Sequence, residues 1–120
     1  MIHIYHNPRC SKSRETLALV EQVAQQLKLN ISVIDYQKTA LSFEQLNALL
    51  QQLGGDVKTM LRADEDEYQT LQLEQADNRR ALESIISHPK LLQRPIVSFQ
   101  GKAAIGRPPE QVLALFKESI

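Results

Sequence analysis

Three features of the 120-residue sequence predict an α/β fold built on one small sheet. First, an apolar segment, an amphipathic segment and a β-branched segment follow one another in the first third of the chain, which is the pattern of a strand, a helix and a parallel strand. Second, a long, broken helical pattern fills the middle of the chain. Third, two short apolar segments flank a glycine turn near the C-terminus, which predicts an antiparallel hairpin.

The N-terminal third supplies the strand, helix and strand. Residues 2–5 contain isoleucine and tyrosine and are followed by the turn signal Asn7-Pro8. Residues 11–27 place apolar side chains at the spacing of one helix face, with glutamate and glutamine on the other side. Residues 31–36 have the β-branched content of a second strand.

The middle of the chain predicts helices. Ser42 and Gln45 form a capping box that begins a helix, and Gly54-Gly55 ends it. Beyond the glycines the apolar pattern stays helical but is broken into short pieces, with a further helix cap expected at Asp77. We expect a small helical insertion at about residues 56–90.

The C-terminal part predicts a hairpin and a final helix. Residues 96–99 and 103–105 are apolar and are separated by a turn that contains Gly101. Pro108 and Pro109 suit the first turn of the last helix. This order describes one domain, residues 1–120, with a thioredoxin-like, four-stranded mixed sheet, helices on both faces and a helical insertion after the second strand.

The composition limits which partners, compartment and cofactors we expect. The 14 basic and 14 acidic residues give a formal net charge of zero, so we expect no nucleic-acid or membrane partner. The single cysteine excludes an internal disulfide, and no secretion signal or membrane span is recognisable, which predicts a cytoplasmic protein. His3, His6 and Cys10 do not repeat a zinc spacing, so we expect no metal. We also expect no bound cofactor and a monomer.

Cys10 is the strongest candidate for a reactive group. It stands at the expected junction of the first strand and the first helix, where exposed backbone N–H groups and the helix dipole favour a thiolate. The same N–H groups suit the binding of an oxyanion. The alternative is a small buried hydrophobic residue, which is a frequent role for a lone cysteine.

The spacing around Cys10 excludes two related mechanisms. A phosphatase-like loop has five residues between cysteine and arginine, whereas three residues separate Cys10 from Arg14. A thioredoxin-type dithiol motif has a second cysteine where this chain has Ser13. Any resolving thiol must therefore come from another molecule.

Four segments carry a resemblance to a known family, in the same order along the chain. The segment from His6 to Leu17 resembles the active-site segment of the glutaredoxin-coupled arsenate reductases, the ArsC-like branch of the thioredoxin-fold proteins. The other matching segments are Met60-Leu61-Arg62, Gln93-Arg94-Pro95-Ile96-Val97 and Ile105-Gly106-Arg107-Pro108-Pro109-Glu110.

The resemblance implies a role for each matched position. Cys10 corresponds to the nucleophile, and His6 to a catalytic histidine on the strand ahead of it. Asn7 and Ser13 match supporting positions in the loop, and Pro95 matches a cis-proline facing the cysteine. The residues expected to bind the oxyanion are Arg62, Arg94 and Arg107.

The resemblance also implies an activity. The protein is expected to reduce arsenate to arsenite through a Cys10 adduct, with glutathione as co-substrate and glutaredoxin as a further partner. Two alternatives stay open. One is a glutathione-dependent thiol oxidoreductase whose arginines bind the carboxylates of glutathione. The other is a non-catalytic, redox-sensitive transcription regulator, although such relatives typically carry the second cysteine that Ser13 replaces.

Overall fold

The computed structural model describes residues 1–117, and the chain divides into two compact units. The sheet unit contains Met1–Tyr36 together with the chain from Arg94 onward. The helical unit contains Gln37–Gln93, so it lies between the second and third strands in the sequence. It begins earlier than the expected insertion because the helix that follows Ser42 packs within it.

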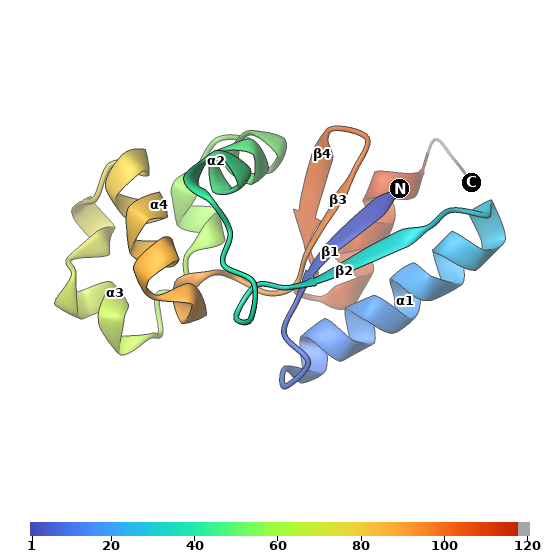
Figure 1. Ribbon diagram of the computed structural model, residues 1–120, viewed down its shortest axis with the longest axis horizontal. Coiled ribbons are helices and arrows are strands. Elements are labelled where there is room, and N and C mark those ends of the chain that lie inside the picture. Colours follow the sequence, from blue (N-terminus) through green and yellow to red (C-terminus); the bar gives the residue numbers. More distant parts are fainter. Residues whose placement is uncertain (118–120) are drawn as a thin grey trace. The chain divides into compact units, whose positions relative to one another are not determined.

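The sheet has four strands in the order β2-β1-β3-β4 (Figure 1). β1 (Ile2–His6) pairs in parallel with β2 (Ile31–Asp35) and antiparallel with β3 (Ile96–Phe99). β3 pairs antiparallel with β4 (Lys102–Ile105). The predicted mixed sheet and C-terminal hairpin are confirmed, and β1 extends one residue further than expected, to His6.

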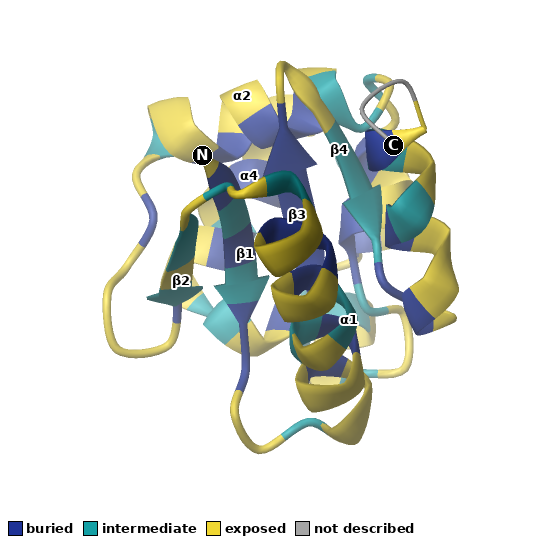
Figure 2. Cartoon of the chain, turned by 90° about the vertical axis from the view of Figure 1, so that its right-hand side faces the viewer, coloured by how far each residue is buried: buried dark blue, intermediate teal, exposed yellow. Residues whose placement is uncertain are grey.

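One face of the sheet carries the core of the sheet unit. α1 (Ser11–Leu27) has the predicted bounds and lies across this face with its polar side outward (Figure 2). η4 (Pro109–Phe116) packs on the same core, and the rings of Phe99 and Phe116 lie with their centroids 4.9 Å apart. The buried residues of this core are Ile2, Ile4, Val20, Val23, Ala24, Val97, Phe99, Val112 and Phe116. Helical cover on the second face stays a prediction.

The last helix differs from the expected one in its winding. η4 is a 3-10 helix with Pro109 in its first turn. Its buried side chains, Pro109, Val112 and Phe116, are spaced by three and then four residues. A spacing of three suits one face of either kind of helix, but a spacing of four is typical of an α-helix, so the sequence pattern does not predict the 3-10 winding.

The helical unit is a set of short helices joined by tight turns. The capping box of Ser42 and Gln45 is present, and Asp77 accepts a hydrogen bond from the Arg80 amide at 2.9 Å, as the sequence predicts. Its α-helices are α2 (Phe43–Gln52), α3 (Asp66–Thr70) and α4 (Asn78–Ser87). Its 3-10 helices are η1 (Val57–Met60), η2 (Leu73–Gln75) and η3 (Pro89–Leu91). Within residues 1–117, no helix has the length and apolar character needed to cross a bilayer.

Candidate active site around Cys10

The sheet topology brings three of the predicted site residues together. The antiparallel pairing of Tyr5 with Ile96 places the loop after β1 beside the segment that leads into β3. The pairing of Ile96 with Ile105 places Arg94 opposite Arg107 at the same end of the hairpin. Cys10, Arg94 and Arg107 therefore lie close together at one end of the strands β1, β3 and β4.

Cys10 is the N-cap residue of α1 and is partly buried. Arg107 Nη2 donates a hydrogen bond to the Cys10 Sγ atom at 3.4 Å. Arg107 is held in this position by a second hydrogen bond, from its Nε to the carbonyl oxygen of Arg94 at 2.8 Å. One guanidinium thus connects the cysteine to the backbone of the segment before β3.

Several groups act on the ionisation of Cys10. Partial desolvation raises its pKa, but backbone hydrogen bonds from Ser13 and Lys12, a hydrogen bond from the Arg94 side chain and the charge of Arg107 lower it. The net result is a Cys10 pKa below the ordinary value of a thiol. The structure therefore favours the reactive thiolate over the alternative of an inert, buried cysteine.

The lowered pKa predicts how Cys10 reacts as the pH changes. Alkylation by iodoacetamide requires the thiolate, so its rate should persist below the pH at which free cysteine loses reactivity and should fall as the pH drops through the pKa of the folded protein. We expect Arg107→Gln to raise that pKa and to move the rate profile to higher pH, because a cation beside the sulfur is lost. Lys102→Gln, at the start of β4 and at the far end of the hairpin, serves as the control. Identical profiles for Arg107→Gln and wild type would contradict the assigned contact.

The Arg94 side chain has unpaired hydrogen-bond donors. Its Nε and Nη1 atoms are buried and have no hydrogen-bond partner among residues 1–117. Buried guanidinium groups are costly unless their donors are satisfied, and their planar fork matches the oxygens of tetrahedral anions. These unpaired donors beside a thiolate are suited to hold an oxyanion.

A buried network fixes the loop that carries Cys10. His6 Nδ1 lies 2.7 Å from the Ser13 hydroxyl, which also accepts a hydrogen bond from the Asn7 amide at 3.0 Å. The Asn7 side chain accepts a hydrogen bond from the Arg9 amide at 3.0 Å. His6, Asn7 and Ser13 are all buried, so the network connects the end of β1 to the first turn of α1.

The environment of His6 favours its neutral form. Burial lowers its pKa, and the charge of Arg14 adds to this effect, while the charge of Asp35 partly opposes it. With the Ser13 oxygen accepting the Asn7 amide hydrogen, the Ser13 hydroxyl hydrogen is available to Nδ1 of the neutral ring. This arrangement favours a buried, neutral histidine that is hydrogen-bonded to Ser13.

Pro95 and Gly106 bring the two arginine segments into close contact with α1. The Arg94-Pro95 bond is cis, as the resemblance implies, and the Arg107-Pro108 bond is also cis. The Gly106 amide donates to the Pro95 carbonyl oxygen at 2.9 Å. A Cβ atom on Gly106 would lie 2.9 Å from both Pro95 Cγ and Thr16 Cγ2, so this position leaves no room for a side chain.

Arg62 belongs to the helical unit, and its predicted role at the anion site stays a prediction. Its amide donates to the Leu91 carbonyl oxygen at 2.8 Å. Its side chain lies 3.4 Å from the Asp64 carboxylate and 3.7 Å from that of Glu65. Its Nη1 atom is buried and has no hydrogen-bond partner within the described part of the chain.

The structure adds Asp35, which the sequence reasoning missed, and gives Arg14 a role in closing the loop. Asp35 lies opposite His6 in the parallel pairing of β1 and β2, and a register that aligned the starts of the two predicted strands would have indicated it. Arg14 Nη1 donates to the Pro8 carbonyl oxygen at 3.0 Å and so closes the loop. No group of three or more His, Cys, Asp or Glu side chains among residues 1–117 is placed to hold a metal ion.

Comparison with known proteins agrees with this geometry. The chain is 41% identical over 117 residues to the Escherichia coli protein called uncharacterized protein YfgD, covering 95% of each chain. It is 42% identical over 115 residues to an arsenate reductase of Haemophilus influenzae, covering 93% of this chain and 96% of that one.

A solved structure has the same fold. The arsenate reductase from Vibrio cholerae superposes with a TM-score of 0.86 at 46% identity, covering 95% of this chain and 96% of that chain. The model of the ArsC family matches residues 5–115, a range that includes Cys10, Arg94 and Arg107. The thioredoxin-like fold, the segment around Cys10 and the family match agree, and the chain belongs to the ArsC family.

Proposed function

We propose that this protein is an arsenate reductase that uses Cys10 as its nucleophile. The observation that carries the proposal is the thiol of lowered pKa in contact with Arg107 and Arg94, the latter with buried, unpaired donors. Relatives of this chain that bear the name arsenate reductase, aligned over nearly their whole length, support the choice of arsenate.

In the first step, the Cys10 thiolate attacks arsenic. A sulfur–arsenic bond forms, one oxygen leaves as water after protonation, and arsenic stays in the +5 state. Arg94 and Arg107 offset the charge of the oxyanion, so that two anions can approach each other. Because the guanidinium of Arg107 is anchored on the Arg94 carbonyl oxygen, it needs little reorganisation during the step.

In the second step, an external thiolate attacks the sulfur of Cys10. A disulfide bond forms between the two sulfurs, and the sulfur–arsenic bond breaks with its electron pair passing to arsenic, which leaves as arsenite. A second external thiol then reduces the disulfide and regenerates Cys10. In total, arsenate and two thiols give arsenite, one disulfide and water.

The external thiols in this proposal are glutathione for the second step and glutaredoxin for the last. Ser13 occupies the position of a possible second cysteine, and its buried side chain is engaged with His6, so the loop offers no internal resolving thiol. A reduced cytoplasm is the compartment that supplies such thiols. His6 and Ser13 act in this proposal as positioning residues, which hold the loop while Cys10 reacts, and the protein acts as a monomer.

A coupled assay tests the proposed function. NADPH oxidation is followed with arsenate, glutathione, glutaredoxin and glutathione reductase, for wild type, Cys10→Ser and the exposed control Lys102→Gln. We expect arsenate-dependent turnover in wild type and the control and none above background in Cys10→Ser. Turnover in Cys10→Ser would contradict the nucleophile. If wild type forms a mixed disulfide with glutathione but gives no arsenate turnover, the protein is a thiol oxidoreductase instead.

A further inference from the structure

The first turn of α1 carries charges that oppose its dipole. The positive end of a helix dipole lies at its N-terminus, so acidic residues are favoured there and basic residues are disfavoured. The first turn of α1 has no acidic residue, and it contains Lys12 and Arg14 instead. Its last turn contains no basic residue. The two basic residues in the first turn are therefore unfavourable for the helix, whereas the C-cap residue Lys28 is favourable, so the charges at the N-terminus need another explanation.

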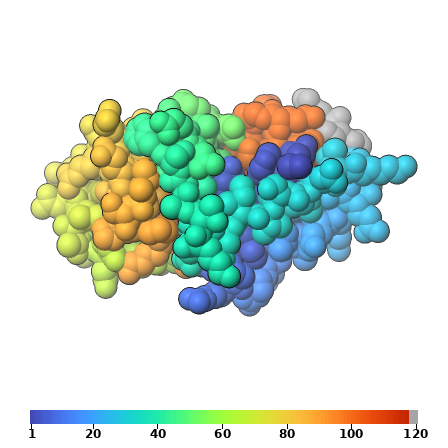
Figure 3. Space-filling view, in the orientation of Figure 1, coloured from blue at the N-terminus to red at the C-terminus, as the bar shows by residue number. Residues whose placement is uncertain are grey.

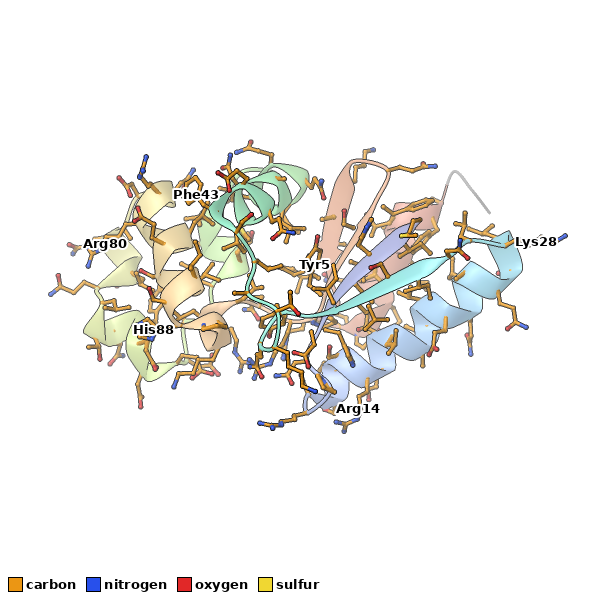
Figure 4. All side chains as sticks on the ribbon, viewed as in Figure 1. Tyr5, Arg14, Lys28, Phe43, Arg80 and His88 are labelled. Carbon is orange, nitrogen blue, oxygen red and sulfur yellow. The ribbon has the colours of Figure 1, made fainter. Side chains whose placement is uncertain are left out.

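Three exposed basic residues lie within four positions of Cys10 in the sequence, and we call Arg9, Lys12 and Arg14 the basic rim. No acidic residue occurs between His6 and Arg14. Figure 4 shows Arg14 at the N-terminal end of α1 and Lys28 at the other end. In the space-filling view, the blue segment that follows β1 projects from the lower edge of this face (Figure 3). The rim is therefore open to molecules that approach Cys10 from solvent.

The known contacts of the rim do not account for its charge. Arg14 closes the loop through the Pro8 carbonyl oxygen, but a neutral donor would serve the same purpose. Lys12 lies 3.4 Å from Glu15, and both side chains are about half exposed, so solvent screens this pair. The Arg9 side chain is exposed.

Arg94 and Arg107 already account for binding of the oxyanion in the proposed function. Arg94 offers buried, unpaired Nε and Nη1 donors, and Arg107 contacts the sulfur itself. Once arsenate is attached to Cys10, however, the thiolate that resolves the adduct must approach a second anion. Cations on the loop and the first helical turn beside Cys10 reduce this repulsion and raise the local concentration of an anionic reactant.

We propose that the basic rim selects the resolving thiol by charge, and favours a small thiol that carries carboxylates, such as glutathione, over neutral or cationic thiols. This inference rests on the proposed function, because it assigns the partner of its second step. The thiolate of the carboxylate-bearing thiol attacks the Cys10 sulfur, and its carboxylates lie toward Arg9, Lys12 and Arg14. The rim residues orient and attract the thiol, while the bond changes occur at Cys10.

A thiol-exchange assay without arsenate tests the rim. Cys10 is converted to its mixed disulfide with 2-thiopyridine, and the release of 2-thiopyridone is followed on addition of glutathione, neutral 2-mercaptoethanol or cationic cysteamine. The added thiolate attacks the Cys10 sulfur and forms a new disulfide bond. The bond between Cys10 and the pyridyl sulfur breaks, and its electron pair leaves with the pyridyl sulfur, which is released as 2-thiopyridone. Rate constants are expressed per thiolate, because the three thiols differ in pKa.

We expect the ratio of the glutathione rate to the 2-mercaptoethanol rate to fall about threefold to tenfold in the double variant Arg9→Gln/Lys12→Gln, and to fall with added salt in wild type. The cysteamine rate should rise in the same variant. Lys102→Gln, which removes one exposed cation at the other end of the hairpin, should leave the ratio unchanged. A ratio that is equal in wild type and the double variant, or that does not respond to salt, would overturn the inference.

The two proposals can fail separately. The exchange assay contains no arsenate, so a missing arsenate turnover leaves its result intact. Conversely, normal arsenate turnover together with an unchanged thiol ratio would reject the rim and keep the proposed function. A fall in all three thiol rates by the same factor would indicate a damaged loop and would also reject selection by charge.

Discussion

Arg94→Met is expected to lower kcat/KM for arsenate by about 10²–10³, the usual effect of removing a preorganised donor from an oxyanion. The variant removes the buried Nε and Nη1 donors and the hydrogen bond to the Cys10 sulfur, while methionine keeps much of the length and apolar volume of the arginine stem. The Arg94 backbone carbonyl remains, so Arg107 keeps its anchor. The defect should therefore concern the anion and the thiolate rather than the path of the chain.

The measurement is steady-state turnover at several arsenate concentrations. Arg79→Met is the matched control, because Arg79 lies on α4 with a largely exposed side chain that pairs with Glu83 at 3.2 Å. Melting followed by circular dichroism establishes that both variants fold. A kcat/KM for Arg94→Met within a factor of two of wild type would reject Arg94 as an oxyanion ligand.

Gly106→Ala is the second change with a large expected effect, on stability. Its Cβ would meet Pro95 Cγ and Thr16 Cγ2 at 2.9 Å and would also contact Thr16 Oγ1, and all these atoms are buried between α1 and the end of β4. Overpacking of this kind typically costs about 1–3 kcal/mol. Because Gly106 precedes Arg107, we also expect weaker contact between Arg107 and Cys10 and slower alkylation of Cys10 at neutral pH.

A double-mutant cycle identifies the cause of this loss. Thr16→Ala removes both Thr16 atoms that a Gly106 side chain would meet, although it also removes the hydrogen bonds from Thr16 Oγ1 to the carbonyl oxygens of Lys12 and Gly106. Unfolding by urea is measured for wild type, both single variants and the double variant. We expect Gly106→Ala to cost less in the Thr16→Ala background, with a coupling of about 0.5–3 kcal/mol. Additive losses would contradict the steric explanation.

The local parts of the fold could be predicted from the sequence, because their signals lie within a few residues of one another. The bounds of α1 follow from its apolar spacing, and the cap of α2 follows from Ser42 and Gln45. The winding of η4 could not be predicted, since the spacing of Val112 and Phe116 is typical of an α-helix. The extent of the helical unit depends on the packing of α2 on α4, a contact between distant segments.

The candidate site also combines features that local sequence predicts with features that depend on distant segments. The hairpin alone places Arg94 opposite Arg107, so their proximity is local information. Their contact with Cys10 requires the pairing of β1 with β3, which joins the two ends of the chain and has no signal within either segment. The hydrogen bond between His6 and Ser13 depends on the conformation of the turn between β1 and α1. The spacing of the two residues in the sequence does not predict the positions of their side chains.

Protection of Cys10 by arsenate is the most direct test of the central claim, that this thiolate and Arg94 form an arsenate site. Alkylation of wild-type protein by iodoacetamide is timed at increasing arsenate without added thiols, with sulfate at equal ionic strength as the control anion. The proposed mechanism predicts that arsenate slows alkylation in a saturable manner, that sulfate protects less, and that Arg94→Met requires much higher arsenate for the same protection. An alkylation rate that is the same at every arsenate concentration would contradict the assignment of Cys10 as the nucleophile.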